Sequence, residues 1–130
     1  MLERKRVLIV DDDPGMSETL TDILEDFGYD VAVANSGERA VAMMTGCLFD
    51  AALMDIRMPG MNGVEAFKKI KETCPAWKVL MMTAYSDGEL VREAVKHGVA
   101  GVFRKPLNIE ALLEWLGRIT TRSSNAGRLC

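Results

Sequence analysis

The sequence predicts an α/β fold in which a doubly wound, five-stranded parallel sheet is covered by five helices. Strand-like and helix-like segments alternate along the 130 residues, and right-handed crossovers between parallel strands then give a layered sandwich. Some of the strand-like runs are apolar throughout, which is typical of parallel strands covered on both faces. We expect the strand order 2-1-3-4-5, with a switch point between the first and third strands.

The first half of the chain contains signals for three strands and two helices. A strand over Arg6–Val10 is followed by Asp13, a good N-cap, with Pro14 at the first helical position. Apolar residues then recur at helical spacing until Gly28, which ends the helix. The next expected elements are a strand over Tyr29–Ala34, a helix from Asn35-Ser36-Gly37 to Thr45-Gly46, and a strand over Asp50–Met54.

The second half continues the alternation. Asn62 and Glu65 have the spacing of a capping box at the start of a third helix, and Ser86 and Glu89 repeat that spacing before a fourth. Asn108 is the expected cap of the last helix. The strands expected between these helices run over Trp77–Met82 and Val99–Arg104, and the fourth helix ends at His97-Gly98.

Polar side chains follow the expected strands at the points where the strands end. Asp11-Asp12-Asp13 follows the first strand, Asp55 the third, Thr83 the fourth and Lys105 the fifth. Because the carboxyl ends of parallel strands lie at one edge of the sheet, these groups should converge there. Several carboxylates in one cleft need a cation, and an oxygen-only site suits Mg²⁺ or Mn²⁺. A lysine in the same cleft suggests an anion as well, so the combination predicts a metal-assisted phosphoryl site.

Each of these residues also has an ordinary structural explanation. Helix capping accounts for Asp13 but not for all three consecutive aspartates, and a lone Asp after a strand is often a turn former. With a metal beside it, the Asp55 carboxylate can act as a nucleophile toward phosphorus. Thr83 can donate a hydrogen bond to a phosphoryl oxygen, and the Lys105-Pro106 bond is a candidate cis peptide.

Composition excludes several classes of protein. The net charge of -3 argues against a nucleic-acid surface. The N-terminal apolar run is too short for a signal peptide, and no stretch approaches the length of a membrane span, so we expect a cytoplasmic protein. Cys47, Cys74 and Cys130 show no framework spacing, and we interpret them as free thiols in a reducing compartment.

These motifs together resemble the receiver domain of bacterial two-component response regulators, which has a flavodoxin-like fold. The resemblance covers about Arg6 to Ile119 and rests on four motifs in order. They are Asp11-Asp12, Asp55-Ile56-Arg57-Met58-Pro59 followed by Gly63, Thr83-Ala84, and Lys105-Pro106. We therefore assign residues 1–121 to a receiver domain and residues 122–130 to a C-terminal tail or the start of a linker.

The resemblance implies a specific role for each site residue. Asp55 would be the phosphoacceptor, and Asp12, Asp55 and the backbone carbonyl of Arg57 would bind Mg²⁺, with Asp11 acting largely through water. Lys105 would pair with the phosphoryl group, and Thr83 would reorient to hydrogen-bond it. The chain would then be a signalling phosphoacceptor rather than a conventional enzyme, although it would promote its own phosphorylation and dephosphorylation.

The resemblance also implies partners. The phosphoryl donor would be a phosphohistidine on a sensor histidine kinase or a histidine phosphotransfer protein, and phosphorylation would change the conformation of the chain to pass on a signal. The resemblance allows a phosphorylation-dependent homodimer, and it implies neither a membrane partner nor direct nucleic-acid binding by this domain.

The sequence departs from the family pattern at one position. Receiver domains often carry an aromatic switch residue three places before the lysine, and here that residue is Val102. Phe103 is one place later, and strand alternation should point it to the opposite face of the sheet. Arg57 and Tyr85 occupy positions where the family tunes phosphate lifetime, and their size predicts modest shielding of the phosphoryl group from water.

Three alternatives remain open from the sequence alone. A haloacid-dehalogenase-like phosphatase would use Asp11 as nucleophile and Asp13 as acid/base, but the expected Gly-Thr or Gly-Val does not follow the Asp-x-Asp. A flavin-binding flavodoxin-like domain would need a Ser/Thr/Gly-rich phosphate loop, and the corresponding loop here is acidic. A degenerate receiver that acts only as a scaffold would lack some of the site residues, and all of them are present.

Overall fold

Five strands and five helices alternate in the computed structural model, which describes residues 4–84 and 88–129. The strands are β1 (Arg6–Val10), β2 (Asp30–Ala34), β3 (Ala51–Asp55), β4 (Lys78–Thr83) and β5 (Gly101–Arg104). The helices are α1 (Pro14–Asp26), α2 (Gly37–Met43), α3 (Gly63–Thr73), α4 (Gly88–Lys96) and α5 (Ile109–Leu129).

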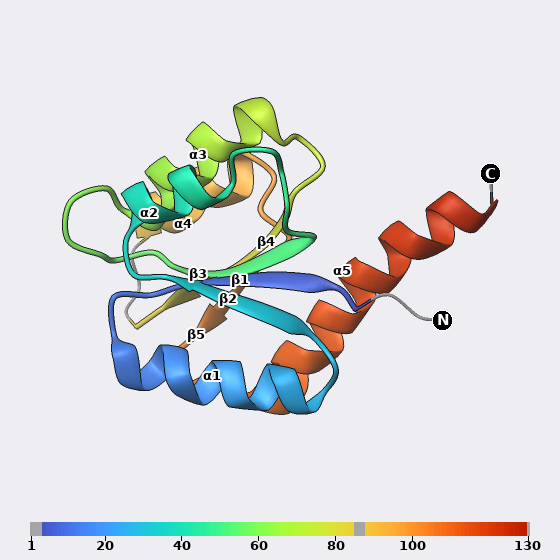
Figure 1. Ribbon diagram of the computed structural model, residues 1–130. Coiled ribbons are helices and arrows are strands. Elements are labelled where there is room, and N and C mark those ends of the chain that lie inside the picture. The colour runs from blue at the N-terminus through green and yellow to red at the C-terminus, as the bar shows by residue number, and fades with distance from the viewer. Residues whose placement is uncertain (1–3, 85–87, 130) are drawn as a thin grey trace.

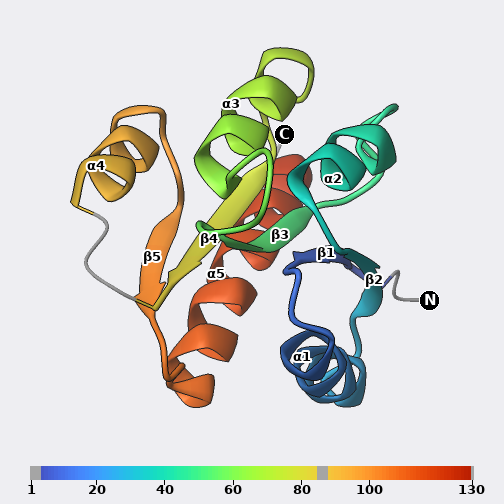
Figure 2. The same cartoon turned by 90° about the vertical axis from the view of Figure 1, so that its left-hand side faces the viewer.

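The sheet has the order β2-β1-β3-β4-β5, and every neighbouring pair is parallel, which confirms the predicted topology. Helices α2, α3 and α4 cover one face of the sheet, and α1 and α5 cover the other (Figures 1 and 2). The chain therefore forms three layers, with the strand ends that carry polar residues on a single edge.

The hydrophobic core consists of two clusters, one on each face of the sheet. In β1 the side chains alternate between them, so that Leu8 and Val10 pack toward α2, α3 and α4, while Val7 and Ile9 pack toward α1 and α5. All five residues of β3 are buried, as the apolar pattern of this segment predicts. The central strands are thus held from both sides, which fixes the positions of the residues that follow them.

The helix starts agree with the capping signals in the sequence. The Asp13 side chain accepts hydrogen bonds from two backbone N–H groups of the first turn of α1, and Asn62 and Glu65 form the complete capping box at α3. Asn108 accepts a hydrogen bond from the third residue after it, at the start of α5. Ser86, predicted to cap the fourth helix, lies outside the described residues.

Element boundaries differ from the predictions mainly at the strand starts. The second strand begins at Asp30 instead of Tyr29, and the fifth begins at Gly101 instead of Val99. Helix α5 continues to Leu129, through the segment that the sequence suggested as a tail or linker. The division between a domain ending at residue 121 and a following segment stays a prediction.

The structure corrects the expectation about the cysteines. Cys47 and Cys74 were expected to be free thiols, but they form a disulfide whose sulfur atoms are 2.07 Å apart, because the loops after α2 and α3 lie side by side. Cys130 lies outside the described residues. Trp77 is buried, whereas Trp115 on α5 is 38% exposed. No helix in the described part of the chain is long and apolar enough to cross a membrane.

Candidate phosphoacceptor site

The loop between β1 and α1 holds the first two aspartates at the carboxyl edge of the sheet. The Asp11 N–H donates to the Ala34 carbonyl at the end of β2 (3.1 Å), which extends the parallel pairing by one residue. One Asp11 carboxylate oxygen accepts a hydrogen bond from the Asp13 N–H at 3.0 Å. Asp11 is 1% exposed, whereas Asp12 beside it is exposed. The pair therefore presents one fixed, buried carboxylate and one that faces solvent.

Asp55 is the last residue of β3 and points to the same edge. Its Oδ1 atom accepts a hydrogen bond from the Arg57 N–H at 3.3 Å, and the residue is 7% exposed. Directly after Asp55, the Ile56 N–H donates to the Met82 carbonyl of β4 (2.9 Å), and the Ile56 carbonyl accepts from the Gly63 N–H (2.8 Å). These bonds fix the loop that leads from Asp55 to α3.

Lys105 brings the positive charge into the acidic site. Its Nζ atom donates a hydrogen bond to Asp55 Oδ2 at 3.1 Å and lies 3.6 Å from Asp11 Oδ2. Its backbone N–H donates to the carbonyl of Thr83 at 2.8 Å, so the ends of β4 and β5 are joined next to the site. Thr83 itself is 2% exposed. The Lys105-Pro106 peptide bond is cis, as the sequence suggested.

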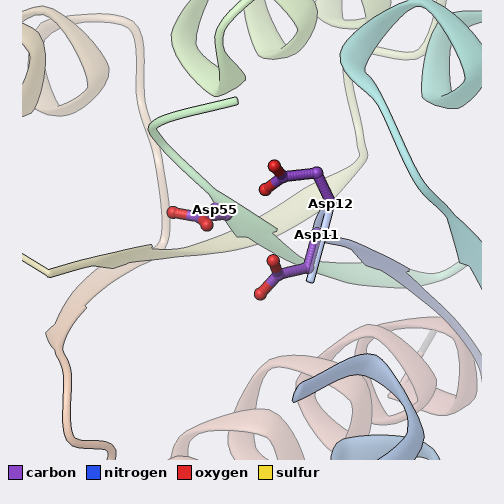
Figure 3. A group of neighbouring side chains, drawn as sticks. All are labelled: Asp11, Asp12 and Asp55. Carbon is purple, nitrogen blue, oxygen red and sulfur yellow. The ribbon is translucent and has the colours of Figure 1, made fainter. Parts of the chain in front are cut away.

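The three carboxylates of Asp11, Asp12 and Asp55 gather at the ends of β1 and β3 (Figure 3). One oxygen atom from each lies within 4.8 Å of the other two. Asp11 Oδ2 is buried and has no hydrogen-bond partner among the described residues, so its contact with Lys105 is an attraction between charges. The donor set consists of oxygen atoms and includes one buried acceptor without a hydrogen bond, which fits a hard divalent cation such as Mg²⁺.

Burial and the close approach of these charges shift the pKa values of Asp11 and Lys105. Burial raises the pKa of Asp11 above its ordinary value, and the negative charges of Asp55 and Asp12 raise it further, against the hydrogen bond from the Asp13 N–H and the charge of Lys105. Burial by itself lowers the pKa of Lys105, but the hydrogen bond and charge of Asp55, together with Asp11, outweigh it and raise the value. Lys105 stays protonated, and a further cation beside Asp11 would be favourable.

Residues of α2 support the site and were not predicted from the sequence. The Met61 N–H, in the loop between β3 and α3, donates to a Glu38 carboxylate oxygen at 3.1 Å. A Cβ on Gly37 would lie 2.7 Å from the Met61 carbonyl oxygen, so α2 and this loop are in close contact. An exposed Glu in the first turn of a helix gives no sequence signal for such a contact, because it also favours the helix dipole.

The fifth strand agrees with the expectation for the missing aromatic switch. Val102 packs against the cluster on the α2–α3–α4 face, and Phe103 packs on the opposite face. There the Phe103 ring meets the Trp115 ring of α5 edge-on, with the ring centres 6.4 Å apart. Tyr85, predicted together with Arg57 to shield the phosphoryl group, lies outside the described residues, and Arg57 is exposed.

Comparison with known proteins identifies the class of protein that this fold and site define. Residues 7–116 match the response regulator receiver domain, and the chain belongs to this family. It is 43% identical over 111 residues to the transcriptional regulatory protein ZraR of Escherichia coli K12, an alignment that covers 83% of this chain. The chain spans about a quarter of the length of ZraR, since the aligned part is 25% of that protein.

Solved structures agree with this assignment. A CheY-like receiver domain protein from Methanospirillum hungatei superposes with a TM-score of 0.90 at 31% identity, covering 95% of this chain and 99% of the other. CheY in a CheX–CheY–BeF3–Mg²⁺ complex from Borrelia burgdorferi superposes with a TM-score of 0.81 at 29% identity, with 88% of each chain covered. The fold is therefore the CheY-like receiver fold, which is not a classical enzyme domain, and the acidic cluster is typical of a phosphoacceptor site.

Proposed function

We propose that this chain accepts a phosphoryl group on Asp55 from the phosphohistidine of a sensor histidine kinase or a histidine phosphotransfer protein. The observation that carries the proposal is the convergence of three carboxylates with Lys105 at the carboxyl ends of β1, β3 and β5. Among these acids, Asp55 has one carboxylate oxygen held by the Arg57 N–H and the other held by Lys105. Its carboxylate is thereby oriented, which favours it as the nucleophile.

The chain's own residues provide the remaining parts of the reaction. Asp12, Asp55 and the Arg57 carbonyl would hold Mg²⁺ (or Mn²⁺), with Asp11 acting largely through water. The chemistry that the ion supplies when bound is neutralisation of the carboxylates and of charge on the phosphoryl oxygens. An Asp55 oxygen forms the bond to phosphorus while the bond from phosphorus to the histidine nitrogen breaks, which leaves an acyl phosphate. Lys105 then shifts its ammonium group from the carboxylate to a phosphoryl oxygen.

The geometry also supports a route by which the signal leaves the site. Phosphorylation adds up to about two negative charges, next to Thr83 and Lys105. Because the Lys105 N–H is bonded to the Thr83 carbonyl, a movement of Thr83 toward the phosphoryl group acts directly on the start of the segment after β5. We propose that the α4–β5–α5 face transmits this change to a partner protein or to a second copy of the chain. We also propose that the chain acts in the cytoplasm.

A phosphatase of the haloacid-dehalogenase type is less well supported. That reaction would require the Asp13 carboxylate as acid/base, but its Oδ1 atom accepts hydrogen bonds from the Gly15 and Met16 N–H groups as the cap of α1. Asp11, which would be the nucleophile, is the more deeply buried of the first two aspartates.

The test is incubation with acetyl phosphate and Mg²⁺, followed by intact-mass measurement of the wild-type chain and two variants. We expect one phosphoryl adduct on the wild type and on Asp50→Asn, a matched control at the opposite edge of the sheet, and none on Asp55→Asn. EDTA should abolish the adduct. An adduct that persists on Asp55→Asn would move the nucleophile to Asp11 and support the phosphatase, and no adduct on the wild type would support a scaffold.

A further inference from the structure

The edge of the sheet opposite the acidic cluster carries the disulfide between Cys47 and Cys74. Cys47 lies in the loop between α2 and β3, and Cys74 directly follows α3, so their Cα atoms are 5.7 Å apart although 27 residues separate them in sequence. Cys47 is exposed, whereas Cys74 is 4% exposed. Cys47 is thus the exposed residue of the pair, and Cys74 belongs to the core.

The backbone at Cys47 adopts a conformation that cysteine rarely adopts. Its φ angle is 54°, and it is the one non-glycine residue with positive φ among residues 4–84 and 88–129. Gly46 directly before it also has a positive φ, of 88°. A non-glycine residue in the left-handed region costs free energy, and such conformations persist where the surroundings hold them in place. Here the conformation directs the Cys47 side chain to Cys74.

The surroundings can accommodate the reduced pair as well as the disulfide. Cys47 Sγ lies 3.5 Å from the Thr73 carbonyl oxygen, and Cys74 Sγ lies 3.7 Å from the Met44 carbonyl oxygen. A disulfide sulfur has no proton to donate, but a thiol has one, and each carbonyl lies within reach of that weak donor. On reduction the two sulfur atoms must move apart, and each thiol then has a carbonyl oxygen close by as a hydrogen-bond acceptor.

The pair is accessible from an open cavity of about 330 Å³. Phe49, Asp50 and Trp77 contribute to its wall beside the two cysteines. A cavity of this size admits the thiol end of a small molecule to Cys47, the exposed residue of the pair.

We propose that Cys47 and Cys74 form a reversible redox modification site that exchanges with a low-molecular-weight thiol–disulfide couple, with attack at Cys47. In oxidation, the Cys47 thiolate attacks a small disulfide, forms a mixed disulfide and releases one small thiolate, which takes up a proton. The Cys74 thiolate then attacks the Cys47 sulfur, forms the protein disulfide and releases the second small thiolate. One small disulfide is reduced to two thiols, and two cysteines are oxidised by two electrons.

The disulfide restrains a helix pair that also touches the acidic site. Helices α2 and α3 pack against each other, and at their other ends Glu38 of α2 accepts the hydrogen bond from Met61 ahead of α3. Oxidation therefore joins the two helices covalently at one end, while the hydrogen bond between Met61 and Glu38 joins them at the other. The redox site stands on its own geometry and does not depend on the phosphoacceptor function.

The test uses the full chain carrying Cys130→Ser, so that two cysteines remain. The folded protein is equilibrated in buffers of varied glutathione to glutathione-disulfide ratio, quenched with iodoacetamide and weighed intact. We expect the protein to change reversibly between a form with two alkylated thiols and a form with none. The oxidised fraction should vary with the redox potential of the buffer with the slope of a two-electron couple. The oxidised form should melt roughly 10 °C higher, because closing a loop of this length restricts the unfolded chain.

Two single variants test the point of attack. Cys74→Ser in the same background leaves the exposed Cys47, which should take up one glutathione readily. Cys47→Ser leaves the buried Cys74, which should react at least tenfold more slowly. The proposal is wrong if two thiols are alkylated at every buffer ratio, if glutathione cannot reduce the bond in the folded chain, or if the two single variants react equally fast.

Discussion

The contact between Gly63 and Asp55 makes a quantitative prediction about the phosphoacceptor loop. Gly63 begins α3, and a Cβ placed on it would lie 2.2 Å from the Asp55 backbone oxygen and 3.1 Å from the Asp55 carbonyl carbon. Both atoms belong to the backbone, so no side chain can rotate away. Ordinary contacts begin at 3.4 Å, so the Gly63→Ala change must move the loop or the helix by about 1 Å.

The energetic consequence follows from the tight packing of this region. Forcing extra atoms into a packed interior costs about 1–3 kcal/mol, and the backbone contact at Gly63 places this substitution at the upper end. A domain of this size loses roughly 4 °C of Tm for each kcal/mol, so we expect a loss of about 10 °C. Because the displaced atoms belong to Asp55 and Ile56, the stabilisation by Mg²⁺ should also fall.

The matched control is Gly117→Ala in α5, where a Cβ meets nothing within 4 Å. This change should stabilise the helix by about 0.5–1 kcal/mol. The assay is thermal unfolding by circular dichroism of the wild type and both variants, with and without Mg²⁺. The reasoning would be refuted if Gly63→Ala melted within about 2 °C of the wild type and kept the full Mg²⁺-induced rise in Tm.

Four further predictions follow from the charges and the capping residues. Because the pKa of Asp11 is raised, Mg²⁺ competes with a proton there, and its affinity, measured by calorimetric titration, should fall by up to about tenfold per pH unit below that pKa. The proton on Asp11 stabilises the metal-free fold at low pH, and this contribution is lost as the pH rises through the raised pKa. The prediction is contradicted if the stability of metal-free Asp11→Asn depends on pH in the acid range in the same way as that of the wild type. Lys105→Ala should lower the metal-free stability by about 1–3 kcal/mol in urea unfolding and enlarge the Mg²⁺-induced gain, because Asp55 loses its cation; equal gains in both proteins would contradict this. Asn62→Ala removes the side chain that accepts from the Glu65 N–H and should cost about 1 kcal/mol, read from the same urea curves.

Much of the fold could be predicted because its determinants are local. The caps at Asp13, Asn62 and Asn108 satisfy N–H groups within three residues, and the apolar run of β3 requires burial on both faces. Strand starts are determined less locally, since Tyr29 and Val99 are compatible with strand or loop and their pairing depends on the neighbouring strand.

The sequence predicts which residues come together at the site, but it does not predict their burial or their supporting contacts. Parallel topology brings Asp11, Asp55 and Lys105 to one edge, and this follows from the strand order. The unequal burial of Asp11 and Asp12 depends on the hydrogen bond from Asp13 and on side-chain packing, which no spacing encodes. The support from Glu38 depends on the conformation of a loop remote in sequence.

The disulfide shows which step from sequence to structure was missing. The predicted strand order already places α2 and α3 side by side on one face of the sheet, with their C-terminal ends at the edge opposite the acidic cluster. Cys47 and Cys74 follow those ends, so their approach to the same edge could have been inferred. A bond between them also requires a particular backbone conformation, since Cys47 lies four residues beyond α2 and reaches Cys74 through a left-handed turn at Gly46 and Cys47. Spacing alone suggested independent thiols, whereas topology combined with a glycine before the cysteine would have favoured the pair.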